Sequence, residues 1–146
     1  MSTFNKVTDT VSVAPQITAD DIEAAANAGV KLIINNRPDG EEAGQPSNDA
    51  LAAIAADKGV AWAAIPVTSG QLTFEAIESM SFALRDAEGP VLAYCRSGTR
   101  SCTLWALAEA FTASRDVADI LKLGAGAGYD LSGMAPTLEH LYNSRA

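Results

Sequence analysis

The length and composition of the chain are those of one globular domain spanning residues 1–146. It has a mass of 15.1 kDa, 48% hydrophobic and 19% charged residues, and a net charge of −8 at pH 7. That charge excludes the basic surface that nucleic-acid binding requires. No apolar run approaches the roughly 20 residues of a membrane span, and the first residues do not resemble a signal peptide. We therefore expect a cytoplasmic protein with neither nucleic-acid nor membrane partners.

Cysteine and histidine are scarce. The chain has two cysteines, Cys95 and Cys102, and one histidine, His140. This set is too small for a zinc site of the Cys/His kind, and a Cys–His pair would require His140 to fold back onto the cysteine. We expect no metal and no other cofactor, and we expect His140 to be exposed or structural. Cys102 is expected to pack in the core; a disulfide with Cys95 is the alternative, disfavoured because the loop and helix between them are expected to hold the two Cα atoms more than roughly 7 Å apart.

In the first half of the chain, runs of strand type alternate with runs of helix type. Thr18 to Asp21 resembles a capping box at the start of a helix that ends near Gly29. Ser47 is the expected cap of the next helix, which ends near Lys58. The predicted strands are Val11–Val13, Lys31–Asn35 and Val60–Val67.

The second half continues the alternation and then becomes helical. A helix is predicted over Thr73–Asp86, with Phe74 and Met80 among its apolar positions, followed by a strand over Val91–Tyr94. A further helix is predicted after the loop that follows this strand. Towards the C-terminus we expect a helix around Arg115–Leu121, a glycine-rich turn over Gly124–Tyr129, and a last helix over Thr137–Asn143.

This alternation predicts an α/β fold with three layers, a mostly parallel sheet between two layers of helices. In such sheets, ligands bind at the carboxyl ends of the strands. Three loops are expected to meet at this edge: residues 36–42, 68–71 and 95–100.

The segment Tyr94-Cys95-Arg96-Ser97-Gly98-Thr99-Arg100-Ser101 lies between a predicted strand and a predicted helix. A helix N-terminus and neighbouring guanidinium groups favour the thiolate form of a cysteine, which is its nucleophilic form. Backbone N–H groups of such a loop surround an anion, and an arginine side chain binds two oxygens at once. The segment therefore predicts a covalent catalyst and an oxyanion receptor in one loop.

Three stretches of the chain resemble small cysteine-dependent phosphatases of the dual-specificity type. They resemble more closely a bacterial family of phosphatase-like or sulfurtransferase domains, the phosphatase-like domain of beta-lactamase hydrolase-like proteins (DUF442 type). Some of its members are fused to a sulfur dioxygenase of the metallo-β-lactamase fold. The resemblance implies a cysteine-phosphatase-like fold, a cysteine nucleophile and a sulfur dioxygenase partner. The stretches are residues 33–42, residues 65–70 and the cysteine loop, residues 94–101.

Two departures from the phosphatase pattern favour sulfur transfer. Only four residues separate Cys95 from Arg100, where the phosphatases have five, and this shorter loop resembles that of rhodaneses. The loop over residues 67–71 also lacks the acid that protonates an alkoxide leaving group. We therefore expect, first, sulfur transfer from thiosulfate or a small persulfide through a Cys95 persulfide. A phosphatase acting through a phosphocysteine, aided by an acid from the 39–42 loop, is the second hypothesis. A non-catalytic anion-binding or sulfur-carrier domain is the third.

Each residue of the loop receives an expected role. Cys95 and Arg100 are the predicted catalytic residues, with a thiosulfate, persulfide or phosphoester as the small anionic substrate. Ser101 is placed to hydrogen-bond the thiolate, as its counterpart does in the phosphatases. The other predicted substrate contacts are Arg96, Ser97, Gly98 and Thr99. Arg37 and Asp39 lie on a loop at the edge of the site, where they are expected either to position Arg100 or bind substrate, or to belong to a solvated acidic loop.

Overall fold

The computed structural model describes residues 4–144. Strands and helices alternate through most of the chain, and the last third is helical. The elements are β1 (Asn5–Lys6), β2 (Val11–Ala14), α1 (Ala19–Asn27), β3 (Leu32–Asn35), α2 (Asn48–Asp57), β4 (Ala61–Ala64), α3 (Phe74–Asp86), β5 (Val91–Tyr94), α4 (Thr99–Phe111), α5 (Val117–Gly126), a short 3-10 turn (Ser132–Met134) and α6 (Ala135–Ser144).

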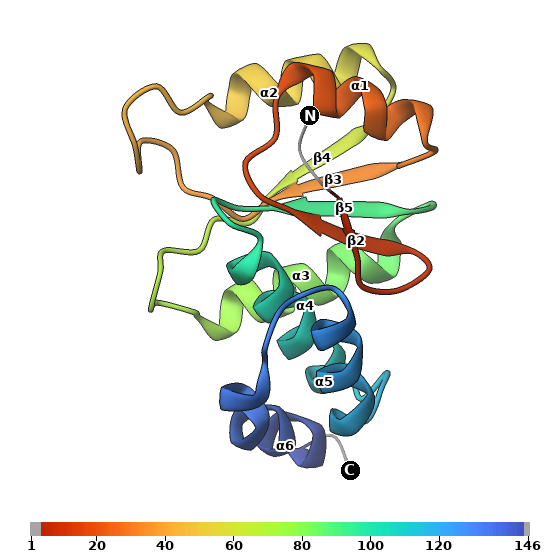
Figure 1. Ribbon diagram of the computed structural model, residues 1–146, viewed down its shortest axis with the longest axis vertical. Helices are drawn as coiled ribbons and strands as arrows, with labels where there is room; N and C mark the ends of the chain where they lie inside the picture. The colour runs from red at the N-terminus through yellow and green to blue at the C-terminus, as the bar shows by residue number, and fades with distance from the viewer. Residues whose placement is uncertain (1–3, 145–146) are drawn as a thin grey trace.

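One five-stranded sheet lies between two layers of helices (Figure 1). Its strand order is β1-β2-β5-β3-β4, and only the β1–β2 pair is antiparallel. Helices α1 and α2 cover one face, and the other four helices lie on the opposite side. The predicted three-layer fold with a mostly parallel sheet is therefore confirmed.

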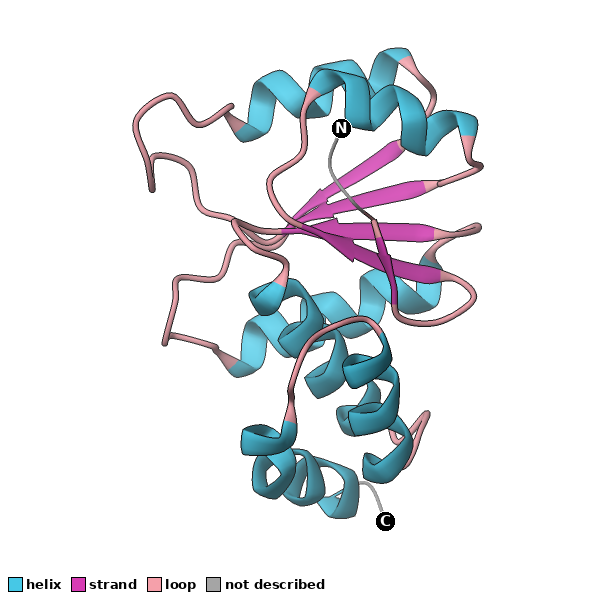
Figure 2. Cartoon of the chain, in the orientation of Figure 1, coloured by secondary structure: helices cyan, strands magenta, loops and turns pink. Residues whose placement is uncertain are grey.

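The carboxyl ends of the parallel strands converge at one edge of the sheet, where the long β3–α2 and β4–α3 connections begin beside the short loop between β5 and α4 (Figure 2). In register, Asn35 at the end of β3 pairs with Tyr94 at the end of β5. The residues after these two strands therefore start from neighbouring positions, as the sequence predicts for a parallel sheet.

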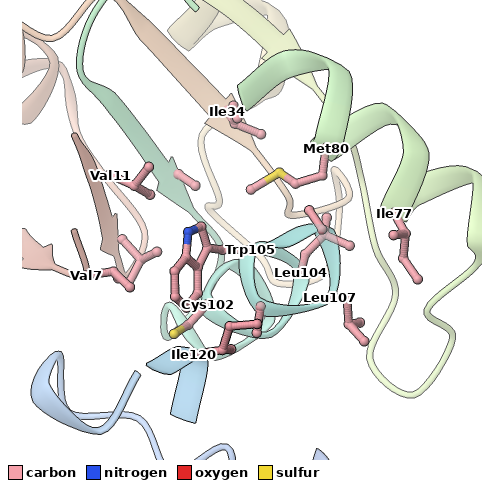
Figure 3. Packing of buried hydrophobic residues seen from close by; sticks show 14 of the residues in the cluster. Val7, Val11, Ile34, Ile77, Met80, Cys102, Leu104, Trp105, Leu107 and Ile120 are labelled. Atoms are coloured by element: carbon pink, nitrogen blue, oxygen red, sulfur yellow. The ribbon is translucent and has the colours of Figure 1, made fainter. Parts of the chain in front are cut away.

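Helix α4, which follows the cysteine loop, is surrounded by other elements. It packs against α3, α5, α6 and the strand β5. Eight of its thirteen residues are buried, as expected for a helix inside a core. Figure 3 shows Trp105 and Leu104 of this helix within that core, close to Ile34 of β3 and Met80 of α3. The loop that precedes α4 is therefore attached to a rigid support.

We expect Ile34→Ala to lower the free energy of unfolding by about 2–5 kcal/mol, because it removes buried methylenes and leaves a cavity. Ile34 is fully buried in the core cluster that includes Trp105. Urea unfolding followed by circular dichroism measures the change. Leu72→Ala is the control, since Leu72 is exposed and its loss is expected to change the free energy by less than about 0.5 kcal/mol. A cost for Ile34→Ala equal to that of the control would contradict this description of the core.

Four details differ from the expectations drawn from the sequence. The third predicted strand is shorter, since pairing with β3 ends at Ala64. Gly124 and Gly126 belong to helix α5 instead of a turn, and Gly124 lies there against the side chain of Leu131. Phe74 is exposed, although it packs edge-on against Phe111 at 5.1 Å between ring centroids. The short antiparallel strand β1 is not evident in the sequence.

Within residues 4–144, none of the helices combines the length and apolar character that crossing a membrane requires.

Candidate active site

The cysteine loop is held against the neighbouring strands by its backbone. The N–H of Cys95 donates to the carbonyl of Ala14 at 3.3 Å, and the carbonyl of Arg96 accepts from the N–H of Gln16 at 3.2 Å. The N–H of Asn36 donates to the carbonyl of Tyr94 at 2.9 Å. These bonds continue the pairing of β5 with both of its neighbours, so the position of Cys95 is set by the sheet.

The loop curls around the sulfur of Cys95. Cys95 is fully buried, and the backbone N–H of Gly98 donates to its Sγ at 3.1 Å. Gly98 is the N-cap of α4 and has φ +93°, a left-handed conformation that favours glycine. The first N–H groups of a helix carry partial positive charge, so the geometry favours negative charge on this sulfur or on an atom bound to it.

The guanidinium group of Arg100 is bound to a carboxylate of the chain itself. Its two terminal nitrogens donate to the carboxylate oxygens of Glu41 at 2.7 and 2.9 Å, and one of them also donates to the carbonyl of Val67 at 2.7 Å. Hydrogen bonding to Glu41 is the main reason that the pKa of Arg100 is raised, and the charge of Cys95 contributes further. Arg100 thus joins the cysteine loop to the 36–42 loop and to Val67, the residue just before the predicted 68–71 loop.

A second arginine, Arg37, also binds the carboxylate of Glu41. The side chain of Arg37 is 2% exposed, and its Nε donates to Glu41 at 3.0 Å. Its other nitrogens reach Gln16 at 2.9 Å and Glu42 at 3.4 Å. Glu42 also pairs with the exposed Arg96 at 3.2 Å. Two carboxylates therefore lie among three arginines at the site.

This arrangement lowers the pKa of Glu41 from its ordinary value of 4.5 to about 2, chiefly through its hydrogen bonds with Arg100. A carboxylate whose pKa is lower in the folded state stabilises the fold above its unfolded pKa, and this contribution is lost as the pH falls towards the folded pKa. We expect Glu41→Gln to be less stable than the wild type at pH 7, with the difference shrinking between pH 4.5 and about 2. Urea unfolding of both proteins across this range measures it, and a constant difference would contradict the ion pair.

The remaining predicted residues occupy different surroundings. Ser97 and Thr99 lie exposed on the outer side of the loop and contact each other at 3.1 Å between their hydroxyl oxygens. Ser101 is fully buried, and its Oγ has no hydrogen-bond partner among residues 4–144, so no bond from it to Cys95 is formed. Asp39 accepts from the N–H of Asn48 at 2.8 Å, at the start of α2, and takes no part in the arginine network.

Cys102 and His140 lie where the sequence predicts. Cys102 is fully buried in the core, and burial is the main reason that its pKa is raised to about 12. His140 is exposed on α6. Within the described part of the chain, no cluster of three or more His, Cys, Asp or Glu side chains is arranged to hold a metal ion.

Three contacts at the site are not evident in the sequence. Gln16 binds Arg37, the carbonyl of Val67 binds Arg100, and Tyr129 contacts the cysteine loop from the C-terminal region. Each depends on elements that only the folded chain brings together. A carbonyl oxygen carries no residue-specific signal at all.

The chain matches known proteins over most of its length. Residues 3–112 match the family model described as beta-lactamase hydrolase-like protein, phosphatase-like domain. A beta-lactamase hydrolase-like protein of Agrobacterium fabrum is 36% identical over 134 residues, which are 92% of this chain but 31% of that protein. The chain therefore spans about a third of the length of such curated relatives.

Solved structures agree with this assignment. A candidate phosphatase from Neisseria meningitidis is 34% identical, with a TM-score of 0.81 over 93% of this chain and 96% of that one. Human DUSP28 shares the fold, with a TM-score of 0.72 over 97% and 94% of the two chains at 19% identity. This domain is a phosphatase-like enzyme of the cysteine-nucleophile class. By its sequence and its fold, the chain belongs to the family of phosphatase-like domains of beta-lactamase hydrolase-like proteins.

Proposed function

We propose that this domain transfers sulfane sulfur through a persulfide on Cys95. The observation that carries the proposal is the occupied guanidinium group of Arg100, whose two terminal nitrogens both bind Glu41. A phosphatase needs such a fork for two oxygens of the phosphoryl group. A single sulfur atom bound to Cys95 does not, because the loop N–H groups suffice to hold it.

In the first step, the Cys95 thiolate attacks the outer sulfur of thiosulfate or of a small persulfide. A bond forms between Sγ and this sulfur, and the former sulfur–sulfur bond breaks, with its electron pair leaving on sulfite or on a thiolate. In the second step, an acceptor thiolate or cyanide attacks the outer sulfur and releases the Cys95 thiolate. The cycle needs no oxidant, no reductant and no proton donor, since each leaving group is a stable anion.

The Gly98 N–H lies 3.1 Å from Sγ, where it stabilises the Cys95 thiolate that attacks in the first step and is released in the second. Arg100 adds positive charge beside the loop. The hydrogen bonds with Glu41 hold the Arg100 guanidinium group in place, and the negative charge of Glu41 partly neutralises the positive charge that Arg100 offers to an anionic substrate.

General acid catalysis, which a phosphatase requires, finds no support in the acids around the site. Glu41 has a pKa of about 2, so it is ionised near neutral pH and does not carry the proton that an alkoxide leaving group needs. Asp39 is bound to the start of α2. The residues after β4, from Val67 to Gln71, contain no acid, and Glu75 lies in the first turn of α3.

Phosphoester hydrolysis is the second candidate function, and the comparisons favour it. The family is described as phosphatase-like, and the similar protein from Neisseria meningitidis is described as a candidate phosphatase. For this function, the 41–42 loop must move away from Arg100 when substrate binds.

A sulfur dioxygenase is the partner that we propose for the sulfur-transfer function. A sulfur-carrier role for such a partner would use the same Cys95 persulfide.

Paired assays on one preparation distinguish the two enzymes. Sulfur transfer from thiosulfate or glutathione persulfide to cyanide is measured beside hydrolysis of an aryl phosphate, with the wild type and Cys95→Ser. We expect turnover in the sulfur assay and none in the phosphate assay. Hydrolysis that depends on Cys95, without sulfur transfer, would overturn the proposal.

Glu41→Gln tests the observation on which the proposal rests. This variant removes the carboxylate that competes for Arg100, so we expect inorganic phosphate to protect Cys95 from alkylation at roughly tenfold lower concentration, equal to about 1.4 kcal/mol. Glu23→Gln is the matched control, because Glu23 is an exposed glutamate on α1 and its loss changes the net charge equally. Equal protection of the two variants would show that Glu41 does not restrict anion binding.

A further inference from the structure

A tyrosine from the C-terminal region contacts the backbone of the cysteine loop. The hydroxyl of Tyr129 donates to the carbonyl of Ser97 at 3.2 Å and accepts from the side-chain amide of Asn5 at 3.0 Å. Tyr129 lies in the turn after α5, and Asn5 lies on β1. The cysteine loop is thereby connected to β1 and to the turn after α5. Tyr129 lies outside the residues 3–112 that the family model matches.

The carbonyl that Tyr129 binds belongs to the same peptide unit as the N–H that binds Cys95. In a planar trans peptide, the C=O of Ser97 and the N–H of Gly98 point in opposite directions. One end of this unit is held by the Tyr129 hydroxyl, and the other end donates to Sγ at 3.1 Å. A hydrogen bond to the carbonyl also polarises the unit, which strengthens its N–H as a donor.

Gly98 allows Tyr129 to approach this closely. A Cβ at this position would overlap the Tyr129 hydroxyl oxygen, so a larger residue here would force the loop and the tyrosine apart. Glycine also leaves the Ser97–Gly98 peptide unit free to rotate, because glycine accepts φ angles of either sign. The Tyr129 hydroxyl opposes this rotation by holding the carbonyl.

Asn5 sets the direction of the hydroxyl hydrogen. Its amide nitrogen is a donor, so the hydroxyl oxygen acts as acceptor there and keeps its single hydrogen for Ser97. Burial raises the pKa of Tyr129 above its ordinary value of 10.0, so this hydrogen is present near neutral pH.

We infer that Tyr129 is a positioning residue for Cys95: its hydroxyl holds the Ser97–Gly98 peptide unit so that the Gly98 N–H stabilises negative charge on the cysteine sulfur. The benefit for the persulfide rests on the proposed function. The benefit for the thiolate does not, because it concerns the free protein.

Alkylation of Cys95 by iodoacetamide across a range of pH tests this inference. Tyr129→Phe removes one oxygen atom and leaves the ring, the charged groups Arg100, Glu41 and Arg37, and Gly98 in place. We expect the pH midpoint of alkylation to rise and the rate at pH 7 to fall about threefold to tenfold, the effect of losing one hydrogen bond. Asn5→Ala, which frees the hydroxyl to turn away from Ser97, is expected to produce a smaller shift in the same direction.

Tyr142→Phe is the matched control, since Tyr142 lies on α6 and packs against the core instead of the loop. Cys102→Ala in every protein restricts alkylation to Cys95. A midpoint for Tyr129→Phe equal to those of the wild type and Tyr142→Phe would overturn the inference. Should Tyr129→Phe unfold, the shift in Asn5→Ala decides the matter. Failure of both thiosulfate and glutathione persulfide to load Cys95 would refute the proposed function and leave this alkylation result intact.

Discussion

Cys95→Ser is expected to abolish sulfur transfer, with a loss of at least about a thousandfold, because a serine hydroxyl neither ionises near neutral pH nor forms a persulfide. The fold should persist, since a serine oxygen can accept from the Gly98 N–H as the sulfur does. Initial rates with thiosulfate or glutathione persulfide measure the loss, and circular dichroism checks the fold.

The matched control for Cys95→Ser is Cys102→Ala. Cys102 is buried in the core and lies on the helix that follows the loop. Its replacement should cost some stability and leave the transfer rate within about twofold, because the cycle proposed above uses one cysteine. A large loss of transfer in Cys102→Ala, with the fold intact, would assign a second thiol to the reaction and contradict that cycle.

Gly98→Ala is expected to lower activity about a hundredfold, the effect of displacing a catalytic group by about 1 Å. The added Cβ would overlap the Tyr129 hydroxyl oxygen and meet its ring carbon Cζ at 3.0 Å, and φ +93° is strained for alanine. Loop and tyrosine must therefore separate, which moves the N–H away from Cys95. We also expect the free energy of unfolding to fall by about 1–3 kcal/mol. Transfer rates and urea unfolding measure the two effects.

Gly59→Ala separates the strain from the collision. Gly59 has φ +75°, and a Cβ there would meet nothing within 4 Å. This control should lose stability without losing activity. In the double variant Gly98→Ala with Tyr129→Phe, the nearest oxygen is gone, so part of the stability should return. Full activity in Gly98→Ala would show that the loop conformation does not matter for the reaction.

Much of the fold could be predicted because local signals and tertiary contacts agree. The capping box of Thr18 and Asp21 forms as expected, and Ser47 and Thr73 cap the helices that follow them. The runs that become β3 and β5 are buried along their whole length, which a continuous apolar pattern indicates for central parallel strands. The helical position of Gly124 and Gly126 is not evident in the sequence, because glycine favours turns locally; for Gly124, close packing against Leu131 explains the glycine in α5.

The centre of the site could also be predicted, since the loop from Cys95 to Arg100 is continuous in sequence. Its electrostatic surroundings could not be predicted to the same degree. The sequence places Arg37 and Glu41 on a neighbouring loop, but it does not show that Glu41 accepts hydrogen bonds from both terminal nitrogens of Arg100. Tyr129 is more than 30 positions from Cys95, in a segment whose path depends on the packing of α5 and α6.

The mass of the intact protein after incubation with thiosulfate or glutathione persulfide tests the central claim most directly. The account predicts the gain of one sulfur atom on the wild type, its removal by cyanide, and no gain on Cys95→Ser. Absence of this gain on the wild type, together with hydrolysis of an aryl phosphate that requires Cys95, would contradict it and establish the phosphatase instead.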